Sequence, residues 1–268
     1  MNELFSLKGK VAVITGAAGV LGGSLARHFA SQGAVVVGLV HRPEQVLPVH
    51  EELGPESVVY ACDVLDLAEL GRIAAEVASR MGKIDILINV AGGNVPGATV
   101  MPDAHFYDMN PEDWQKVVDL NLNGTVYPTI AFSRIFARQG SGCVLNISSM
   151  AAYDALSRVA GYGAAKSGVS NFTKWLAAEM AMKYGDKIRV NALAPGFFIG
   201  KQNRSALLNP DGSYTERSLK VLAKTPMGRF GYIDELNGAA QFLCSDAAAF
   251  VTGVVLPVDG GFSSFSGV

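Results

Sequence analysis

Short apolar runs alternate with longer segments of helical periodicity along most of the chain. The apolar runs predict strands at Lys10–Thr15, Ala34–Val40, Ser57–Ala61, Ile84–Asn89, Cys143–Ser148, Ile188–Leu193 and Val254–Val258. Helices are predicted at Leu21–Gln32, Leu67–Met81 and Tyr162–Tyr184, with a long helix after Pro111. Strands that are apolar throughout and separated by helices are typical of a parallel sheet covered on both faces. The pattern therefore predicts an α/β fold, a Rossmann-type doubly wound parallel sheet of seven strands flanked by helices.

The chain has no Pro/Ser-rich linker, so residues 1–268 are predicted to form a single domain. The segment 197–229 is polar and irregular, and it follows the sixth predicted strand. Ligands of doubly wound folds bind at the carboxyl ends of the strands. We therefore expect this segment to be a lid over a ligand site.

Composition narrows the classes of protein to which the chain can belong. Apolar residues make up 49% of the chain and charged residues 17%, which excludes a disordered protein. A net charge of -2 gives no basic field for nucleic acid, and no apolar run reaches the length of a membrane span. The first ten residues lack a signal-peptide stretch, and the three cysteines form neither a CxxC pair nor a Cys/His cluster. We therefore expect a cytoplasmic protein with no nucleic-acid or membrane partner and no metal.

A glycine-rich turn, TGAAGVLGG at 15–23, links the first strand to the first helix. Glycines there let the backbone approach a pyrophosphate, and the helix N-terminus supplies N–H donors and a positive dipole end. The predicted cofactor contacts in this turn are Gly16, Gly19, Val20, Leu21 and Gly22. The alternative is a glycine-rich turn that holds no ligand.

The second strand ends without the acid that usually binds the adenosine ribose of NAD, and His41 and Arg42 follow it. Because Arg42 could pair with a 2′-phosphate, the sequence favours NADP(H), with NAD(H) possible. The alternative is that Arg42 is a solvated loop residue. Later strand ends add predicted cofactor contacts at Asp63 and Val64, where a carboxylate can meet the adenine amino group, and at Asn89, Ala91 and Gly92.

A serine, a tyrosine and a lysine follow the fifth strand in a pattern that suits proton transfer. Tyr162 and Lys166 are four residues apart and share one face of a helix, and Ser149 lies thirteen residues upstream of the tyrosine. Oxidation of an alcohol needs a base, and a nearby ammonium should lower the tyrosine pKa from about 10. The serine hydroxyl can hold the substrate oxygen. Alone, such a Tyr/Lys pair is more often a pair of surface neighbours.

Together these segments resemble the short-chain dehydrogenase/reductase family over essentially the whole chain. The resemblance rests on TGAAGVLG (15–22), NVAG (89–92), DLNLNG, NISS (146–149), YGAAK (162–166) and PG (195–196). It implies Ser149, Tyr162 and Lys166 as catalytic residues, with the latter two also touching the cofactor. It further implies Asn121 as an anchor for a water in the proton relay, cofactor contacts at Pro195 and Gly196, and a homotetramer.

Two positions depart from the family pattern. Val20 stands where the family's TGxxxGxG turn has glycine, and Gly200 stands where many members have a threonine that bonds the nicotinamide carboxamide. The first departure implies an altered turn. The second makes backbone groups near Phe198 and Ile199 the candidates for the carboxamide contact.

A narrower resemblance is to the family's D-mannonate oxidoreductase branch, also called fructuronate reductase. It rests on stretches such as LLNPDGSYTERS, KTPMGRFG and FVTGVVLPVDGGFSSFSGV. A hexonate substrate calls for cationic and polar groups, for which the candidates are Asn94, Ser149, Arg158, Asn203 and Arg204.

The leading expectation is therefore an NAD(P)-dependent oxidoreductase that interconverts D-fructuronate and D-mannonate. Another polyol, ketogluconate or ketone is the alternative substrate. A nucleotide-binding protein without turnover is the alternative of another class.

Overall fold

The computed structural model describes residues 3–200 and 204–267, which contain a parallel sheet in the order β3-β2-β1-β4-β5-β6-β7. Its strands are β1 (Val11–Thr15), β2 (Val35–Val40), β3 (Val58–Ala61), β4 (Ile86–Asn89), β5 (Gly142–Ile147), β6 (Ile188–Pro195) and β7 (Val255–Val258). Every neighbouring pair is parallel, from the β1–β2 register Val11↔Val35 to the β6–β7 register Ala192↔Val255. The predicted seven-stranded doubly wound sheet is confirmed.

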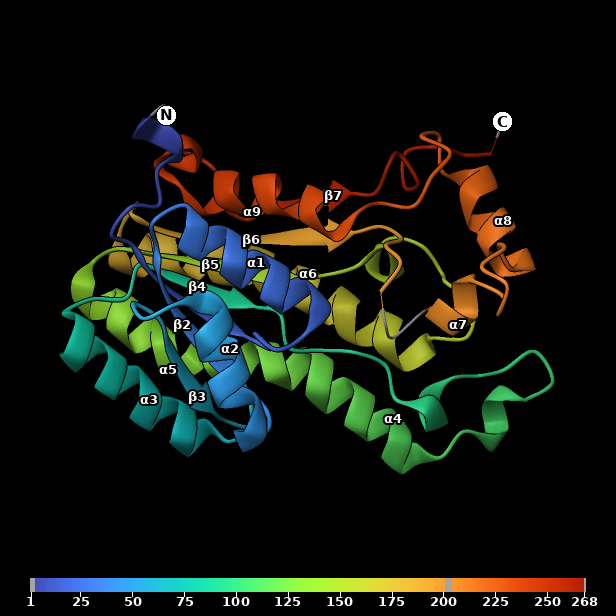
Figure 1. Ribbon diagram of the computed structural model, residues 1–268, viewed down its shortest axis with the longest axis horizontal. Coiled ribbons are helices and arrows are strands. Elements are labelled where there is room, and N and C mark those ends of the chain that lie inside the picture. Colours follow the sequence, from blue (N-terminus) through green and yellow to red (C-terminus); the bar gives the residue numbers. More distant parts are fainter. Residues whose placement is uncertain (1–2, 201–203, 268) are drawn as a thin grey trace.

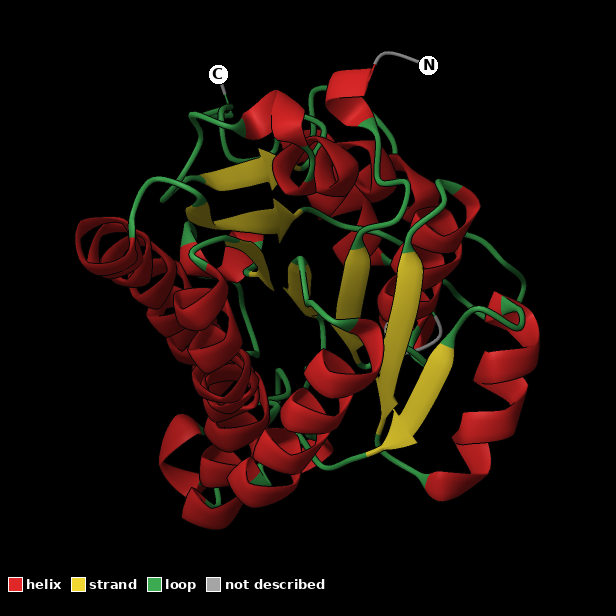
Figure 2. Cartoon of the chain, turned by 90° about the vertical axis from the view of Figure 1, so that its left-hand side faces the viewer, coloured by secondary structure: helices red, strands yellow, loops and turns green. Residues whose placement is uncertain are grey.

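Helices cover both faces of the sheet (Figure 2). They are α1 (Val20–Ser31), α2 (Val46–Leu53), α3 (Leu67–Met81), α4 (Pro111–Val118), α5 (Gly124–Gln139), α6 (Ala160–Tyr184), α7 (Arg204–Leu207), α8 (Glu216–Lys224) and α9 (Asn237–Cys244). None of the helices in the described part of the chain is long and apolar enough to cross a membrane.

The side chains of β1 show how one strand supplies two cores. Val11 and Val13 pack into the cluster formed with α3, α5 and α6, whereas Ala12 and Ile14 pack into the cluster formed with α1 and α9. Successive side chains of a strand point to opposite faces of the sheet, so a strand buried on both faces must be apolar throughout. This burial explains why the apolar runs located the strands.

Two features of the helices were not predicted. The long helix expected after Pro111 is present as α4 and α5, and a π-helical turn at Asp119–Asn123 joins them. The segment 197–229, expected to be irregular, contains the short helices α7 and α8 in its described part, with loops between them. Thr215 caps α8 by accepting a hydrogen bond from the Ser218 N–H at 3.2 Å.

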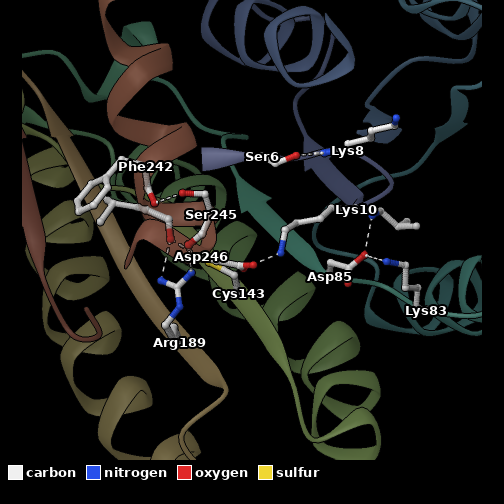
Figure 3. Close-up of polar contacts among 12 residues, drawn as sticks. Ser6, Lys8, Lys10, Lys83, Asp85, Cys143, Arg189, Phe242, Ser245 and Asp246 are labelled. Atoms are coloured by element: carbon white, nitrogen blue, oxygen red, sulfur yellow. Dashed lines mark hydrogen bonds and ion pairs between the residues drawn. The ribbon is translucent and has the colours of Figure 1, made fainter. Parts of the chain in front are cut away.

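The amino-terminal end of the sheet is held together by polar contacts (Figure 3). The Asp85 carboxylate accepts the Val11 N–H at 2.7 Å, and the Lys10 ammonium pairs with Asp246 at 2.9 Å. The buried Arg189 guanidinium donates to the carbonyl oxygens of Leu243 at 2.8 Å and Ser245 at 3.0 Å. The charged side chains of Asp85, Lys10 and Arg189 thus bind partners within the fold and stabilise this end of the sheet.

The opposite end of the sheet gathers the long connecting segments. Figure 1 shows β6 and β7 pointing toward the end of the molecule at which α7, α8 and the C-terminus lie. The segment that precedes α4 extends to the same end (Figure 1). Ligands of doubly wound folds bind at this carboxyl end, so a ligand site is expected there.

Candidate active site

The glycine-rich turn after β1 is folded tightly against the turn after β4. Gly16 has a left-handed backbone, with φ of 66°, and a methyl group at Gly22 would collide with the Gly16 carbonyl oxygen. The Thr15 hydroxyl accepts the N–H groups of Val90 and Ala91 at 2.9 and 3.0 Å. Thr15 therefore joins the two turns, a role that the sequence reasoning missed although the residue stands at a strand end.

Val20, which replaces a family glycine, begins α1 and is 39% exposed. Gly19 precedes it as the helix cap, with an extended backbone and no side-chain hydrogen bond. The Val20 side chain is accommodated because it is exposed at the helix start, next to Leu21. The close contact with the Gly16 backbone is made by Gly22 instead. The first-turn N–H groups of a helix have no intrahelical acceptor, so they remain suited to an anion.

The ends of β2 and β3 place predicted cofactor residues at the surface. His41 and Arg42 are exposed, and the Arg42 guanidinium lies 3.5 Å from the Glu44 carboxylate. The Asp63 side chain is exposed and accepts the Leu65 N–H at 2.9 Å, next to the buried Val64. The neighbouring Glu44 was not considered from the sequence.

The Asn89 side chain is buried at the end of β4. It is 1% exposed, and its amide donates to Thr129 at 2.9 Å and to Asn146 at 2.8 Å. The amide thus ties β4 to α5 and β5. The cofactor contact predicted at this position, where small residues let a cofactor lie against the backbone, therefore concerns the Asn89 backbone and stays a prediction.

Asn121 reaches the carboxyl end of the sheet because it lies in the π-helical turn between α4 and α5. Its amide donates to the Gly93 and Val117 carbonyl oxygens at 2.6 and 2.8 Å, and its oxygen accepts the Gly93 N–H at 3.0 Å. Single π-helical turns inside helices are frequent at functional sites, since they redirect a side chain. Here the turn fixes the loop that follows β4.

Gly92 occupies the space between two polar groups of the site. A methyl group there would lie 2.8 Å from Asn121 Oδ1 and 3.4 Å from Lys166 Nζ. The absence of a side chain at Gly92 therefore lets the loop after β4 lie directly against Asn121 and Lys166. This close approach, the tight turn after β1 and the start of α1 together fit a nicotinamide dinucleotide.

Lys166 is almost wholly buried, with 3% of the residue exposed. Its ammonium donates to the Ile147 carbonyl oxygen at 2.8 Å and lies 5.7 Å from the centroid of the Tyr162 ring. Burial lowers the pKa of the Lys166 ammonium to about 8. The predicted pairing of Tyr162 and Lys166 on one helix face is thus seen in α6.

Ser149 and Tyr162 face each other across the site. The Ser149 hydroxyl accepts the Ala151 N–H at 3.1 Å and also hydrogen-bonds the Tyr162 phenol. Burial raises the pKa of Tyr162 above its ordinary value, and the bond with Ser149 acts in the opposite direction. The expected lowering of this pKa by Lys166 is wrong for the chain alone, because the cost of burying a phenolate prevails.

The end of β6 leads into the segment predicted to be a lid. Pro195 is the last residue of β6, and a methyl group at Gly196 would lie 2.6 Å from the Asp259 Cα atom in the turn after β7. Phe198 bridges to Gly231, and Ile199 packs against the apolar cluster of Leu207, Val221 and Phe230. The two residues therefore join the sheet edge to α7 and α8.

The predicted substrate residues lie in three places. Asn94 is exposed, and its amide donates to the Thr99 hydroxyl at 2.7 Å. Arg158 is half-buried just before α6, and Arg204 is exposed at the start of α7. Asn203 lies outside the described residues. Over the described ranges, no group of three or more His, Cys, Asp or Glu side chains converges as a metal site would require.

A family comparison agrees with this arrangement. Residues 16–263 match the family model described as Enoyl-(Acyl carrier protein) reductase, and the chain belongs to the short-chain dehydrogenase/reductase family. It is an NAD(P)-dependent oxidoreductase acting on CH–OH groups or the corresponding carbonyls.

Three proteins are similar to this chain over nearly their whole length. A crystal structure from Haemophilus influenzae, provisionally described as a D-mannonate oxidoreductase with bound NAD, is 40% identical with a TM-score of 0.91, covering 98% of each chain. The D-threitol dehydrogenase of Mycolicibacterium smegmatis is 36% identical over 97% of this chain and 95% of its own. A gluconate 5-dehydrogenase of Burkholderia cenocepacia, in complex with NADP and tartrate, is 34% identical with a TM-score of 0.84, covering 98% of each chain.

Proposed function

We propose that the protein interconverts a keto sugar acid and its hydroxy acid, with D-fructuronate and D-mannonate as the leading pair. The observation that carries the chemistry is the grouping of Ser149, Tyr162 and Lys166, in which Tyr162 lies next to both of the others. The substrate class is supported by the sugar-acid and polyol relatives and by the half-buried Arg158 beside the catalytic helix.

In the proposed catalytic step, Ser149 positions the substrate oxygen and Tyr162 transfers the proton. A bound nicotinamide supplies or accepts the hydride. In reduction, the Ser149 hydroxyl holds the substrate oxygen and the neutral Tyr162 phenol donates its proton to the developing alkoxide. In oxidation, the Tyr162 phenolate takes the hydroxyl proton. The raised pKa of Tyr162 keeps the phenol protonated near neutral pH, which is the form that reduction needs.

Lys166 and Asn121 are proposed to return the proton to Tyr162. With its pKa lowered to about 8, the Lys166 ammonium can give up a proton near neutral pH. Asn121 and Lys166 both lie against Gly92, and this proximity suits a relay through a water held by Asn121. Gly16, Gly19, Val20, Leu21 and Gly22 are proposed to hold the pyrophosphate, with Asp63, Val64, Ala91, Pro195, Gly196, Phe198 and Ile199 lining the rest of the cofactor site.

NADP(H) is proposed as the favoured cofactor, because Arg42 offers a cation where NAD-binding relatives of this fold usually carry an acid. Glu44 competes with a phosphate for Arg42, but both side chains are more than 60% exposed, at 63% and 68%. An exposed ion pair of this kind is worth about 0–1 kcal/mol, so a phosphate can displace it. The preference should therefore be moderate, with NAD(H) still accepted.

The test of the proposed function is a panel of D-mannonate, D-fructuronate, 5-keto-D-gluconate and neutral polyols, assayed with both nicotinamides. D-fructuronate with NADPH should give the highest kcat/KM. Preference for a neutral polyol over every sugar acid would refute the substrate class and favour the polyol alternative that the D-threitol relative suggests.

The protein is further proposed to assemble as a homotetramer in the cytoplasm. The outer faces of α5 and α6 expose Ile130, Trp175 and Met182, which are 40, 58 and 78% exposed. Trp175 and Met182 are seven residues apart and share one face of α6, and large exposed apolar side chains are typical of subunit contacts. The three cysteines are unpaired, which suits a reducing compartment. Analytical ultracentrifugation of the wild type and of Trp175→Glu tests the assembly.

A further inference from the structure

Two arginines lie side by side where α8 packs on the loop before α6, and among the described residues neither has an acidic partner. Arg158 lies four residues before Tyr162, and Arg217 lies in the first turn of α8. The Arg217 guanidinium donates to the Ser157 hydroxyl at 2.8 Å, which places it beside Arg158. Across residues 3–200 and 204–267, neither guanidinium forms an ion pair with a carboxylate, whereas Arg27, Arg72 and Arg229 do.

The backbone of Arg158 is strained. Its φ of 77° is the single left-handed value recorded for a non-glycine residue within the described ranges. Such a conformation is costly for a residue with a Cβ atom and persists only where the surroundings hold it. The Arg158 carbonyl accepts the Val100 N–H at 3.0 Å, so the loop before α4 helps to fix it.

The two positive charges also oppose one another. Burial lowers the pKa of Arg217, and the charge of Arg158 lowers it further. Half-buried like charges with no counter-ion destabilise the folded chain, and an anion between them would remove that cost. The Lys224 ammonium, which pairs with Asp154 at 2.9 Å, ties α8 to the same loop by a separate contact and leaves Asp154 occupied.

We propose that Arg158 and Arg217 form a binding subsite for the carboxylate of the substrate, with α8 contributing half of it. A pair of guanidinium forks can bind a carboxylate through parallel N–H···O bonds. Arg158 lies in the segment between Ser149 and Tyr162, and under the proposed function the carboxylate that it binds is that of the reacting sugar acid. This subsite rests on the proposed function, and it gives α8 a role in choosing acids over neutral polyols.

The subsite is tested by direct binding in a Tyr162→Phe background, so that turnover does not interfere. Calorimetry with the oxidised cofactor present measures the Kd of D-mannonate and of D-mannitol, which has an alcohol in place of the carboxylate. Arg217→Ala and Arg158→Gly should each raise the D-mannonate Kd at least about tenfold and leave the D-mannitol affinity within about twofold. Arg158→Gly also relieves the strained backbone, so loss of folding is not expected there.

Lys220→Ala is the matched control, because Lys220 is an exposed cation of α8 that pairs with Glu216. It should leave both Kd values unchanged. Unaltered D-mannonate binding in Arg217→Ala, or equal losses for acid and polyol, would overturn the subsite. Binding that depends on Arg217 without turnover of any sugar acid by the wild type would uphold the subsite and refute the proposed function. Turnover of sugar acids that is unchanged by substitution of either arginine would uphold the proposed function and refute the subsite.

Discussion

Replacement of Lys166 by methionine should abolish turnover and change how the stability of the protein depends on pH. Lys166 is 3% exposed, and burial lowers its pKa from 10.5 to about 8. Between these two values the unfolded chain binds a proton that the folded chain has released. Stability of the wild type should therefore rise with pH across this window, because the folded state carries the depressed pKa.

The magnitude follows from the size of the shift. Each pKa unit is worth about 1.36 kcal/mol, so between about pH 7 and about pH 10 the wild type should gain about 2.5 kcal/mol relative to the variant. At about pH 7 the variant should be the more stable protein, because it no longer buries an ammonium. This stability advantage of the variant at about pH 7 is reduced by about 1–3 kcal/mol, since the Ile147 carbonyl oxygen loses its hydrogen-bond donor.

Urea unfolding of both proteins at the two pH values measures this difference, and other groups that titrate in the same range cancel in the comparison. Lys174→Met is the control, since Lys174 is an exposed residue of the same helix. It should show no pH-dependent difference from the wild type. A Lys166→Met difference that stays constant from about pH 7 to about pH 10 would refute the reasoning about the buried ammonium.

Three further predictions concern the cofactor and the proton. Arg42→Asp should move the ratio of kcat/KM values from NADPH toward NADH by at least about tenfold, and an unchanged ratio would show that Arg42 does not contact the phosphate. Gly92→Ala, which sets a methyl group 2.8 Å from Asn121 Oδ1, should lower kcat, whereas Gly71→Ala on α3, with nothing within 4 Å, should not. Because the Tyr162 pKa is raised, alcohol oxidation should accelerate with rising pH in the alkaline range and carbonyl reduction should slow, and flat pH–rate profiles in both directions would contradict this.

The strands were predictable because every residue of a strand is buried when helices cover both faces of the sheet, so the whole strand must be apolar. Val11 and Ala12 face opposite cores, and both must be apolar. The π-helical turn at Asp119–Asn123 left no such pattern, because one additional residue within a helix barely alters its periodicity. The helix α8 was missed because its apolar face is narrow, with Val221 as its buried apolar side chain.

The catalytic group was predictable from spacing, but its electrostatics and its neighbours were not. A separation of four residues is enough to place Tyr162 and Lys166 on one helix face. The direction of the Tyr162 pKa depends on burial by distant segments, which spacing does not reveal. Arg217 was not predicted at all, since it meets Arg158 through the packing of α8 on the loop before α6.

The most direct test of the central claim is the reduction of D-fructuronate by NADPH in the wild type and in Tyr162→Phe, with NADPH binding followed by fluorescence. If Tyr162 donates the proton, the variant should lose about 10²–10⁴-fold in kcat while its Kd for NADPH stays within about twofold of the wild type. Reduction by Tyr162→Phe at the wild-type rate would contradict the account.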